Sequence, residues 1–280
     1  MERVRMTPAR WVLLVVGGLM VIGLVTLSTL NLVSWLGRTT EVSHATYRPT
    51  GDRLALSTTS GDVHLVGDNG ETVRVTTTLK YGLWKPTVQT SSGPDGLQLD
   101  SHCRTIAGFC SVDYQIALPR SLTVQLHTDS GDVHLAGITG RVDLSSSSGD
   151  VILTDLSGAA VSGSTSSGDI RITNVTSSQL TVRTRSGDIH GSGLTNRQID
   201  AKTGSGDIRM TVTTAPDLVT ARTGSGNINL TVPQADDGYR VTTTTGSGDT
   251  HIRVIRNDTS DRALDLHTGS GDIQVTPAAS

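Results

Sequence analysis

The sequence predicts an all-β fold of the β-solenoid type that follows an N-terminal transmembrane helix. Two observations lead to this prediction: a Ser-Gly-Asp/Asn-apolar motif recurs to the C-terminus, and one long segment near the N-terminus is apolar and uncharged. Each copy of the motif supplies a glycine and then an aspartate or asparagine: Gly61 and Asp62, Gly131 and Asp132, Gly149 and Asp150, Gly168 and Asp169, Gly187 and Asp188, Gly206 and Asp207, Gly226 and Asn227, Gly248 and Asp249, Gly271 and Asp272. From the second copy onward the glycines lie 18, 19, 19, 19, 20, 22 and 23 residues apart, a drifting interval typical of stacked repeats.

The composition limits what kind of core and what kind of partner are possible. Only 3% of the residues are aromatic and 31 of 280 are glycine, so burial must come from many small aliphatic contacts. A disordered Ser/Thr-rich stalk is the alternative, but regular alternation within each repeat argues against it. The net charge of −3 does not favour nucleic-acid binding, and we predict no nucleic-acid partner.

The N-terminal segment predicts a single-pass membrane protein. No charged residue occurs from Trp11 to Gly37, and about 20 apolar residues suffice to cross a bilayer. Arginines dominate the residues before this run, so the positive-inside rule places the N-terminus in the cytoplasm and the rest outside. A cleaved signal peptide is the alternative, with Ser43-His44-Ala45 as a passable cleavage site, although the apolar run is longer than a usual signal.

The sequence divides into six parts. We expect a cytoplasmic N-terminus (1–10), a transmembrane helix (11–37), a linker (38–49), an N-terminal β cap region with one outlying repeat (50–118), tandem β-solenoid repeats (119–276) and a tail (277–280). Within each repeat, apolar residues alternate with polar ones before and after the motif, which predicts strand, corner, strand and return loop. Repeats should stack as parallel strands, with Pro277 ending the last strand and blunting that edge.

The corner motif explains its own residue types. Glycine supplies the positive φ of a sharp bend, and aspartate can accept hydrogen bonds from backbone amides just downstream. Asn227 can make the same bond without a charge, so the position requires a turn former more than a calcium ligand. Threonine and serine two residues before the turn serine should form hydroxyl ladders along the stack. Thr250 and Gly191 interrupt otherwise aliphatic columns.

The two cysteines, Cys103 and Cys110, lie in the part predicted to be outside the cell. A disulfide closing a hairpin is the simplest interpretation of this pair in an oxidising compartment. Metal binding needs more ligands than this spacing supplies, and a catalytic thiol has no evident partner.

The run from Tyr114 to Gly137 and the following Val142-Asp-Leu-Ser-Ser-Ser-Ser-Gly-Asp-Val resemble a bacterial adhesin-like β-strand-repeat family of unknown function. The resemblance covers about residues 50–276. It implies a right-handed β-solenoid (a single-stranded parallel β-helix), an envelope setting, often a membrane anchor, and no established enzymatic activity.

No catalytic or cofactor motif stands out, and we predict a non-enzymatic protein without a cofactor or a metal. A glycan-active β-helix needs converging acids and bases, whereas these aspartates recur as one turn column. The candidate anion-binding residues are five outward cations that recur on neighbouring repeats: Arg171, Arg183, Lys202, Arg209 and Arg222. A merely solvated face is the alternative. His134, His190 and His251 share an outward column, but other residues interrupt it.

Together these observations predict a membrane-anchored extracytoplasmic β-solenoid that serves as an adhesin-like or envelope interaction module. Its predicted partners are the membrane, crossed once with the N-terminus inside, and a cell-wall polymer or envelope protein. Two alternatives stay open: a regulatory partner in envelope stress sensing, and a glycan-active enzyme.

Overall fold

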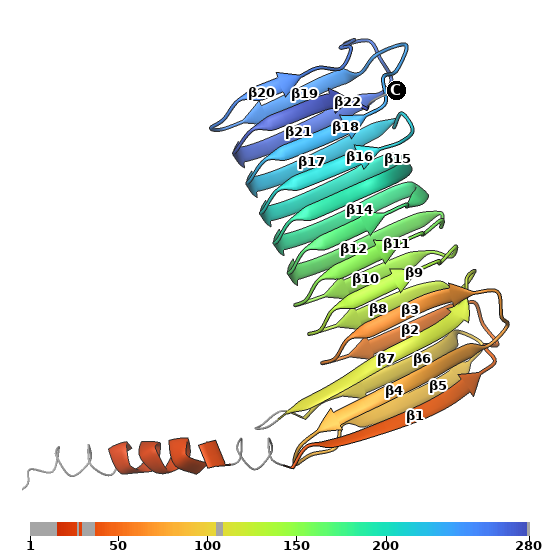
Figure 1. Ribbon diagram of the computed structural model, residues 1–280, viewed down its shortest axis with the longest axis vertical. Coiled ribbons are helices and arrows are strands. Elements are labelled where there is room, and N and C mark those ends of the chain that lie inside the picture. The colour runs from red at the N-terminus through yellow and green to blue at the C-terminus, as the bar shows by residue number, and fades with distance from the viewer. Residues whose placement is uncertain (1–15, 27, 30–36, 105–108, 279–280) are drawn as a thin grey trace, which may run out of the picture.

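The computed structural model describes residues 16–26, 28–29, 37–104 and 109–278 of the chain. Strands stack one above another along the length of the molecule, and a helical N-terminal segment lies at one end of the stack (Figure 1). The all-β prediction is confirmed, and neighbouring repeats pair in parallel as a solenoid requires. The right-handed course of the chain stays a prediction.

The strands form two sheets, which we call sheet A and sheet B. One rung is a strand of sheet B, a corner, and the next strand in sheet A. Sheet A contains, in spatial order, β1 (Thr39–Tyr47), β4 (Val73–Tyr81), β7 (Cys110–Pro119), β3 (Val63–Asp68), β9 (Val133–Ala136), β11 (Val151–Thr154), β13 (Ile170–Thr173), the first part of β15 (Ile189–Ser205), β16 (Ile208–Val212), β18 (Ile228–Val232), β22 (Ile273–Pro277) and β20 (Thr250–Ile252). Sheet B contains β5 (Thr87–Gly93), β6 (Gly96–His102), β2 (Arg53–Thr58), β8 (Thr123–Thr128), β10 (Val142–Ser146), β12 (Ala160–Ser167), β14 (Thr176–Ser186), the second part of β15, β17 (Leu218–Ser225), β21 (Ala263–Ser270) and β19 (Arg240–Thr245).

The order of rungs in space differs from their order in sequence at both ends. The first repeat, predicted as the one outlying repeat of the N-terminal cap region, stacks directly on the tandem repeats, because β2 pairs with β8 and β3 pairs with β9. At the other end the last repeat, β21 and β22, inserts between β17–β18 and β19–β20.

The polarity of the inward residues explains the exchange at the C-terminal end. The rung formed by β19 and β20 carries Thr243 and Thr250 where other rungs carry aliphatic residues, and Thr250 is exposed. The last repeat offers Leu264 and Ile273, which are buried to 1% and 0% exposure between two neighbouring rungs. Burying the apolar rung and exposing the polar one is the favourable arrangement.

Two expectations near the ends were wrong. Pro277 does not blunt the terminal edge, because β22 lies inside the stack and Pro277 pairs with Val232. Residues 38–49 are not simply a linker, since Thr39–Tyr47 forms β1 and pairs antiparallel with β4 over its whole length. The sequence does not indicate this strand, because β1 is a largely exposed edge strand and carries few apolar residues.

The N-terminal helical residues are 16–26 and 28–29. Within the part of the chain that is described, no helix has both the length and the apolarity needed to cross a membrane. Of the predicted span, 11–37, residues 11–15, 27 and 30–36 lie outside the described residues.

The core is a set of aliphatic columns between the two sheets. Val133, Val151, Ile170 and Ile189 follow one another on sheet A and are each fully buried. A second aliphatic column on sheet A contains Leu153 and Ile172, and Gly191 interrupts it on the next rung. A Cβ at Gly191 would lie 2.8 Å from Leu194 Cδ1. The side chain of Leu194, beyond an irregularity in β15, therefore occupies space that an aliphatic residue at position 191 would need.

The corner glycines are required by both conformation and space. All nine have φ between 114° and 145°, where only glycine is comfortable. A Cβ on any of them would lie 2.1 to 2.2 Å from the carbonyl oxygen of the residue stacked beneath it. Successive corners thus approach so closely that no side chain fits between them.

The corner aspartates form a ladder that links rungs rather than closing each turn. Apart from Asp249 on the terminal rung, which only donates its amide to Asp272, the Oδ1 atom of each accepts a hydrogen bond from the backbone amide of the corresponding residue on the next rung, at 2.7 to 3.2 Å. We expected bonds to amides within the same corner, so this is a correction. Asn227 accepts from the Asp272 amide at 2.8 Å, which explains why an amide side chain can replace the carboxylate.

The ladder begins one rung earlier than the motif. Asp113 of β7 accepts from the Asp62 amide at 3.2 Å, although Val112 stands where later copies have glycine. Burial tends to raise the pKa of Asp113, but hydrogen bonds from Lys80, Ser111 and the Asp62 amide hold it below its ordinary value.

The threonines before the corner also differ from our expectation. From Thr165 onward, all six donate their hydroxyl to the carbonyl oxygen of a corner glycine on the neighbouring rung at 2.9 to 3.2 Å, as Thr184 does to Gly168. Their buried hydroxyls satisfy the corner backbone instead of forming a hydroxyl ladder.

Candidate binding surfaces

The five candidate anion-binding residues lie on two different faces of the molecule. Arg183, Lys202 and Arg222 occupy consecutive positions on sheet B. Arg171 and Arg209 lie on sheet A, in alternate rungs separated by His190. The five therefore do not form one stripe, because a strand before the corner and a strand after it belong to different sheets.

The two arginines on sheet A are bound by corner aspartates. Arg171 donates to Asp150 at 2.8 Å and to Asp169 at 2.9 Å, and Arg209 donates to Asp207 at 2.6 Å. A hydrogen bond from the Asp169 backbone amide lowers the pKa of the Asp150 carboxyl. Burial raises this pKa in part, and Arg171 lowers it further. These arginines offset the repulsion of stacked carboxylates, which is a structural role.

The three cations on sheet B are partly offset by acids. Arg183 pairs with Asp200, and Arg222 pairs with Asp265 at 2.5 Å. Lys202 lies between them and has no ion pair among the described residues. Lys202 is therefore the member of the set whose charge is available to a ligand.

A shallow groove of about 360 Å³ lies beside Lys202 on the outer surface of sheet B, and its polar lining is basic and hydroxylic. Its three cations are Arg183, Arg185 and Lys202, and none of the described residues that line it is acidic. The other lining residues are Ser146, Ser164, Thr165, Ser166, Thr184 and Gly204. Arg185 was missed in the sequence because it lies one residue before the turn serine, outside the column we followed; the Arg-Thr-Arg spacing was the available signal.

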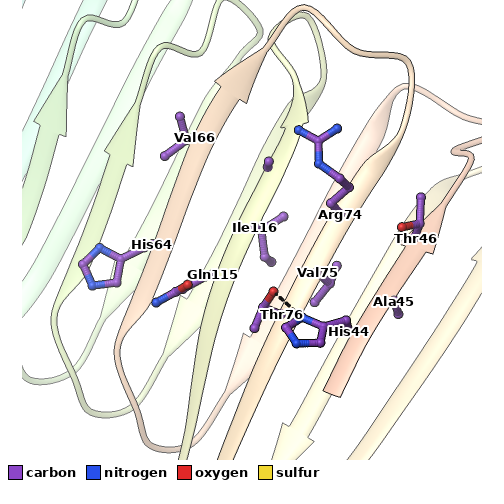
Figure 2. Close-up of a pocket in the computed structure, with 11 residues that line it drawn as sticks. His44, Ala45, Thr46, His64, Val66, Arg74, Val75, Thr76, Gln115 and Ile116 are labelled. Carbon is purple, nitrogen blue, oxygen red and sulfur yellow. Dashed lines mark hydrogen bonds between the residues drawn. The ribbon is translucent and has the colours of Figure 1, made fainter. Parts of the chain in front are cut away.

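A second groove, of about 540 Å³, lies on the outer face of sheet A near the N-terminal end (Figure 2). His44 and His64 line it, and His44 Nδ1 lies 3.0 Å from Thr76 Oγ1. The His64 ring packs edge-on against His134 with centroids 5.8 Å apart. The lining is mixed, since Val66, Val75, Ile116 and two alanines accompany the polar groups, and its arginine, Arg74, is paired with Asp68.

The histidine column is longer than the sequence indicated. Register places His64 beside His134, and His44 joins the same line through Thr76 and Gln115. Sequence reasoning missed both because β1 and β2–β3 are out of sequential order in the stack. In the described ranges, no three His, Cys, Asp or Glu side chains gather in a way that could hold a metal ion.

The cysteines lie at the N-terminal end of the rod. Cys103 and Cys110 are joined by a disulfide, with their Cα atoms 5.8 Å apart. Cys110 begins β7 opposite Tyr81 of β4.

Comparison with known proteins places these features in a family. A family model described as Toastrack DUF4097 matches residues 97–276. Among solved structures, a putative adhesin from Bacteroides fragilis NCTC 9343 is 14% identical, with 85% of this chain and 97% of that chain covered and a TM-score of 0.54. A putative cell adhesion protein from Clostridium sporogenes ATCC 15579 is 11% identical, with 86% and 100% covered and a TM-score of 0.30. A putative lipid binding protein from Parabacteroides distasonis ATCC 8503 is 12% identical, with 85% and 97% covered and a TM-score of 0.41.

No curated protein matches this chain. The likeness to the Bacteroides structure shows a shared fold, and the family model spans well over half of the sequence, with residues 97–276 taking in the corner ladder from Asp113 onward and the basic groove. The chain therefore belongs to the Toastrack DUF4097 family.

Proposed function

We propose that the chain is a membrane-anchored, extracytoplasmic and non-enzymatic module that binds anionic groups of an envelope polymer. The observation that carries this proposal is the basic groove on sheet B, which Lys202 and Arg185 line together with Arg183, itself paired with Asp200, and in which no described lining residue is acidic. Guanidinium and ammonium groups beside hydroxyl donors recognise phosphate or carboxylate oxygens. A groove open to solvent on a regular rod suits a polymer that lies across several rungs.

Strand β1 supports an uncleaved anchor. Cleavage after Ala45 would remove most of the nine-residue strand Thr39–Tyr47, which pairs with β4 along its length. The apolar run that ends at Gly37 then remains attached to the rod, crosses the membrane once and leaves the arginine-rich N-terminus inside.

The test is polymer binding by the full-length protein in nanodiscs of zwitterionic lipid. The probes are poly(glycerol phosphate), polygalacturonate and neutral dextran, which separate phosphate, carboxylate and uncharged chains. We expect binding to an anionic probe that weakens with added salt, and no binding to dextran.

Charge reversal locates the site. Arg183→Glu, Arg185→Glu and Lys202→Glu together should remove about 1.5 to 3 kcal/mol at ~0.5 to 1 kcal/mol per cation, or roughly 10- to 150-fold in affinity.

The matched control reverses three exposed arginines elsewhere with the same change in net charge: Arg141, Arg240 and Arg253. Equal losses in both triple variants would reduce the effect to overall charge and refute a site in the groove. Unchanged binding in the groove variant would refute the proposal outright and return attention to a regulatory protein partner.

A further inference from the structure

The few exposed aromatic residues of the rod are concentrated at one tip. The chain has 3 Trp, 4 Tyr and 1 Phe, and Tyr114 and Tyr239 are fully buried in the core. Trp84 and Phe109, by contrast, are 41% and 40% exposed, and Leu83 beside them is 43% exposed. Exposed large apolar side chains gathered at one place indicate a surface that contacts something apolar.

Three segments distant in sequence build this tip. The amide of Gly82, at the end of β4, donates to the Phe109 carbonyl oxygen at 3.0 Å. The Arg38 guanidinium carbon lies 4.8 Å from the centroid of the Phe109 ring. Lys85 pairs with Glu41 of β1 at 2.5 Å, which holds the loop after β4 against the first strand.

The tip carries cations beside its apolar side chains, and one of these cations, Lys85, is paired with Glu41. Arg38 and Lys85 are both exposed or partly exposed and lie beside the aromatic side chains. Indole and phenyl rings flanked by cations are the side chains that favour the headgroup layer of a bilayer, because one end is apolar and the other stays wet.

The position of the tip, next to the end of the predicted membrane span, indicates a lipid bilayer as its partner. The predicted membrane span ends at Gly37, and the next residue, Arg38, touches Phe109. Each headgroup layer is about 5 to 7 Å thick, so a ring in contact with the residue after the span lies within that layer. Figure 1 shows β1, β4 and β7 at the end of the stack from which the helical segment leads, opposite the end that carries β19 and β20.

We propose that Leu83, Trp84 and Phe109 insert into the interface of the bilayer that holds the anchor, and so fix the rod against the membrane. The inference rests on the membrane anchor of the proposed function. It adds a second attachment point, with a lipid surface as the partner of the tip.

The experiment uses Trp84 as its own reporter in the full-length protein. Trp11→Phe and Trp35→Phe leave Trp84 as the sole tryptophan, and the protein is placed in nanodiscs of phosphatidylcholine or of the same lipid brominated near the carbonyl end of its chains. We expect Trp84 emission to be lower in the brominated discs than in the unbrominated ones. Aqueous iodide should quench Trp84 less in the intact protein than after proteolysis has released the rod from the bilayer.

A matched control places the reporter at the opposite end of the rod. Ile255, which follows β20, is 52% exposed, so Ile255→Trp combined with Trp84→Phe moves the reporter without a new burial problem. That reporter should be quenched by iodide and unaffected by brominated lipid. If Trp84 behaves like the reporter at position 255, the inference is overturned.

Alkaline carbonate extraction separates this failure from failure of the anchor. A chain that stays in the membrane fraction while Trp84 remains open to iodide contradicts lipid contact alone. A chain that is released into the supernatant contradicts the membrane anchor, and with it both proposals.

Discussion

Replacing Gly187 with alanine tests whether the close stacking of corners sustains the solenoid. Gly187 has φ of +145°, and a Cβ there would lie 2.1 Å from the Gly168 carbonyl oxygen. Because an ordinary contact begins at 3.4 Å, the two rungs would have to separate by about 1 Å. That movement stretches two hydrogen bonds between these rungs, from the Gly168 amide to Ser186 O, now 3.0 Å, and from the Asp188 amide to Asp169 Oδ1, now 2.9 Å.

The expected cost follows from these two effects. Backbone strain of ~1 to 3 kcal/mol and the weakening of two hydrogen bonds at about 1 kcal/mol each give roughly 3 to 5 kcal/mol. Domains are stable by only about 5 to 15 kcal/mol, so the loss is a large fraction of the total.

Equilibrium urea unfolding followed by circular dichroism measures the loss, with hydrogen exchange of β14 and β15 amides to detect local opening. The matched control is Gly163→Ala, because Gly163 lacks a positive φ and a Cβ there would meet Leu153 Cδ1 at 3.3 Å. We expect that variant to change the free energy of unfolding by less than about 1 kcal/mol. Equal costs in the two variants, or a cost below about 1 kcal/mol for Gly187→Ala, would refute the stacking argument.

Three further predictions follow. The Asp169 amide and Arg171 lower the pKa of Asp150, so the contribution of this carboxylate to folding stability is present above the ordinary pKa of 3.8 and is lost as pH falls through the lower folded value. Asp150→Asn should therefore flatten the decline of Tm between roughly pH 5 and pH 2, and an unchanged slope would contradict this. Reducing the single disulfide should cost about 2 kcal/mol in urea unfolding, whereas no change would mean that the closed loop constrains nothing. Thr243→Leu combined with Thr250→Ile should make the exposed terminal rung apolar, so that molecules associate end to end and the sedimentation coefficient rises. A sample as monodisperse as wild type would show that the polar residues of this rung do not prevent self-association.

Repeat spacing alone predicted part of the candidate site. The spacing correctly placed Arg183, Lys202 and Arg222 in adjacent rungs, because a constant offset from the corner puts residues in register. It grouped Arg171 and Arg209 with them, although these lie on the other sheet and bind corner aspartates. Ion-pair partners depend on which side chains meet across rungs, and a single repeat does not contain that information.

The tip illustrates a similar limit. Trp84 and Phe109 are 25 residues apart in sequence and belong to no motif, so nothing local marks them as neighbours. The loop that carries Trp84 lies next to Phe109 because β4 ends where its antiparallel partner β7 begins, next to β1. The polar composition of β1 concealed this arrangement from sequence reasoning.

The sequence by itself determined the all-β class, the corners and the alternating columns, since turn chemistry and side-chain alternation act over a few residues. Only the tertiary structure decided the order of the rungs. The first repeat moves next to β8, and the last repeat moves inside β19 and β20. The physical reason is that burial rewards an apolar rung only when neighbours cover both of its faces, and which rungs supply those neighbours is settled by the whole stack.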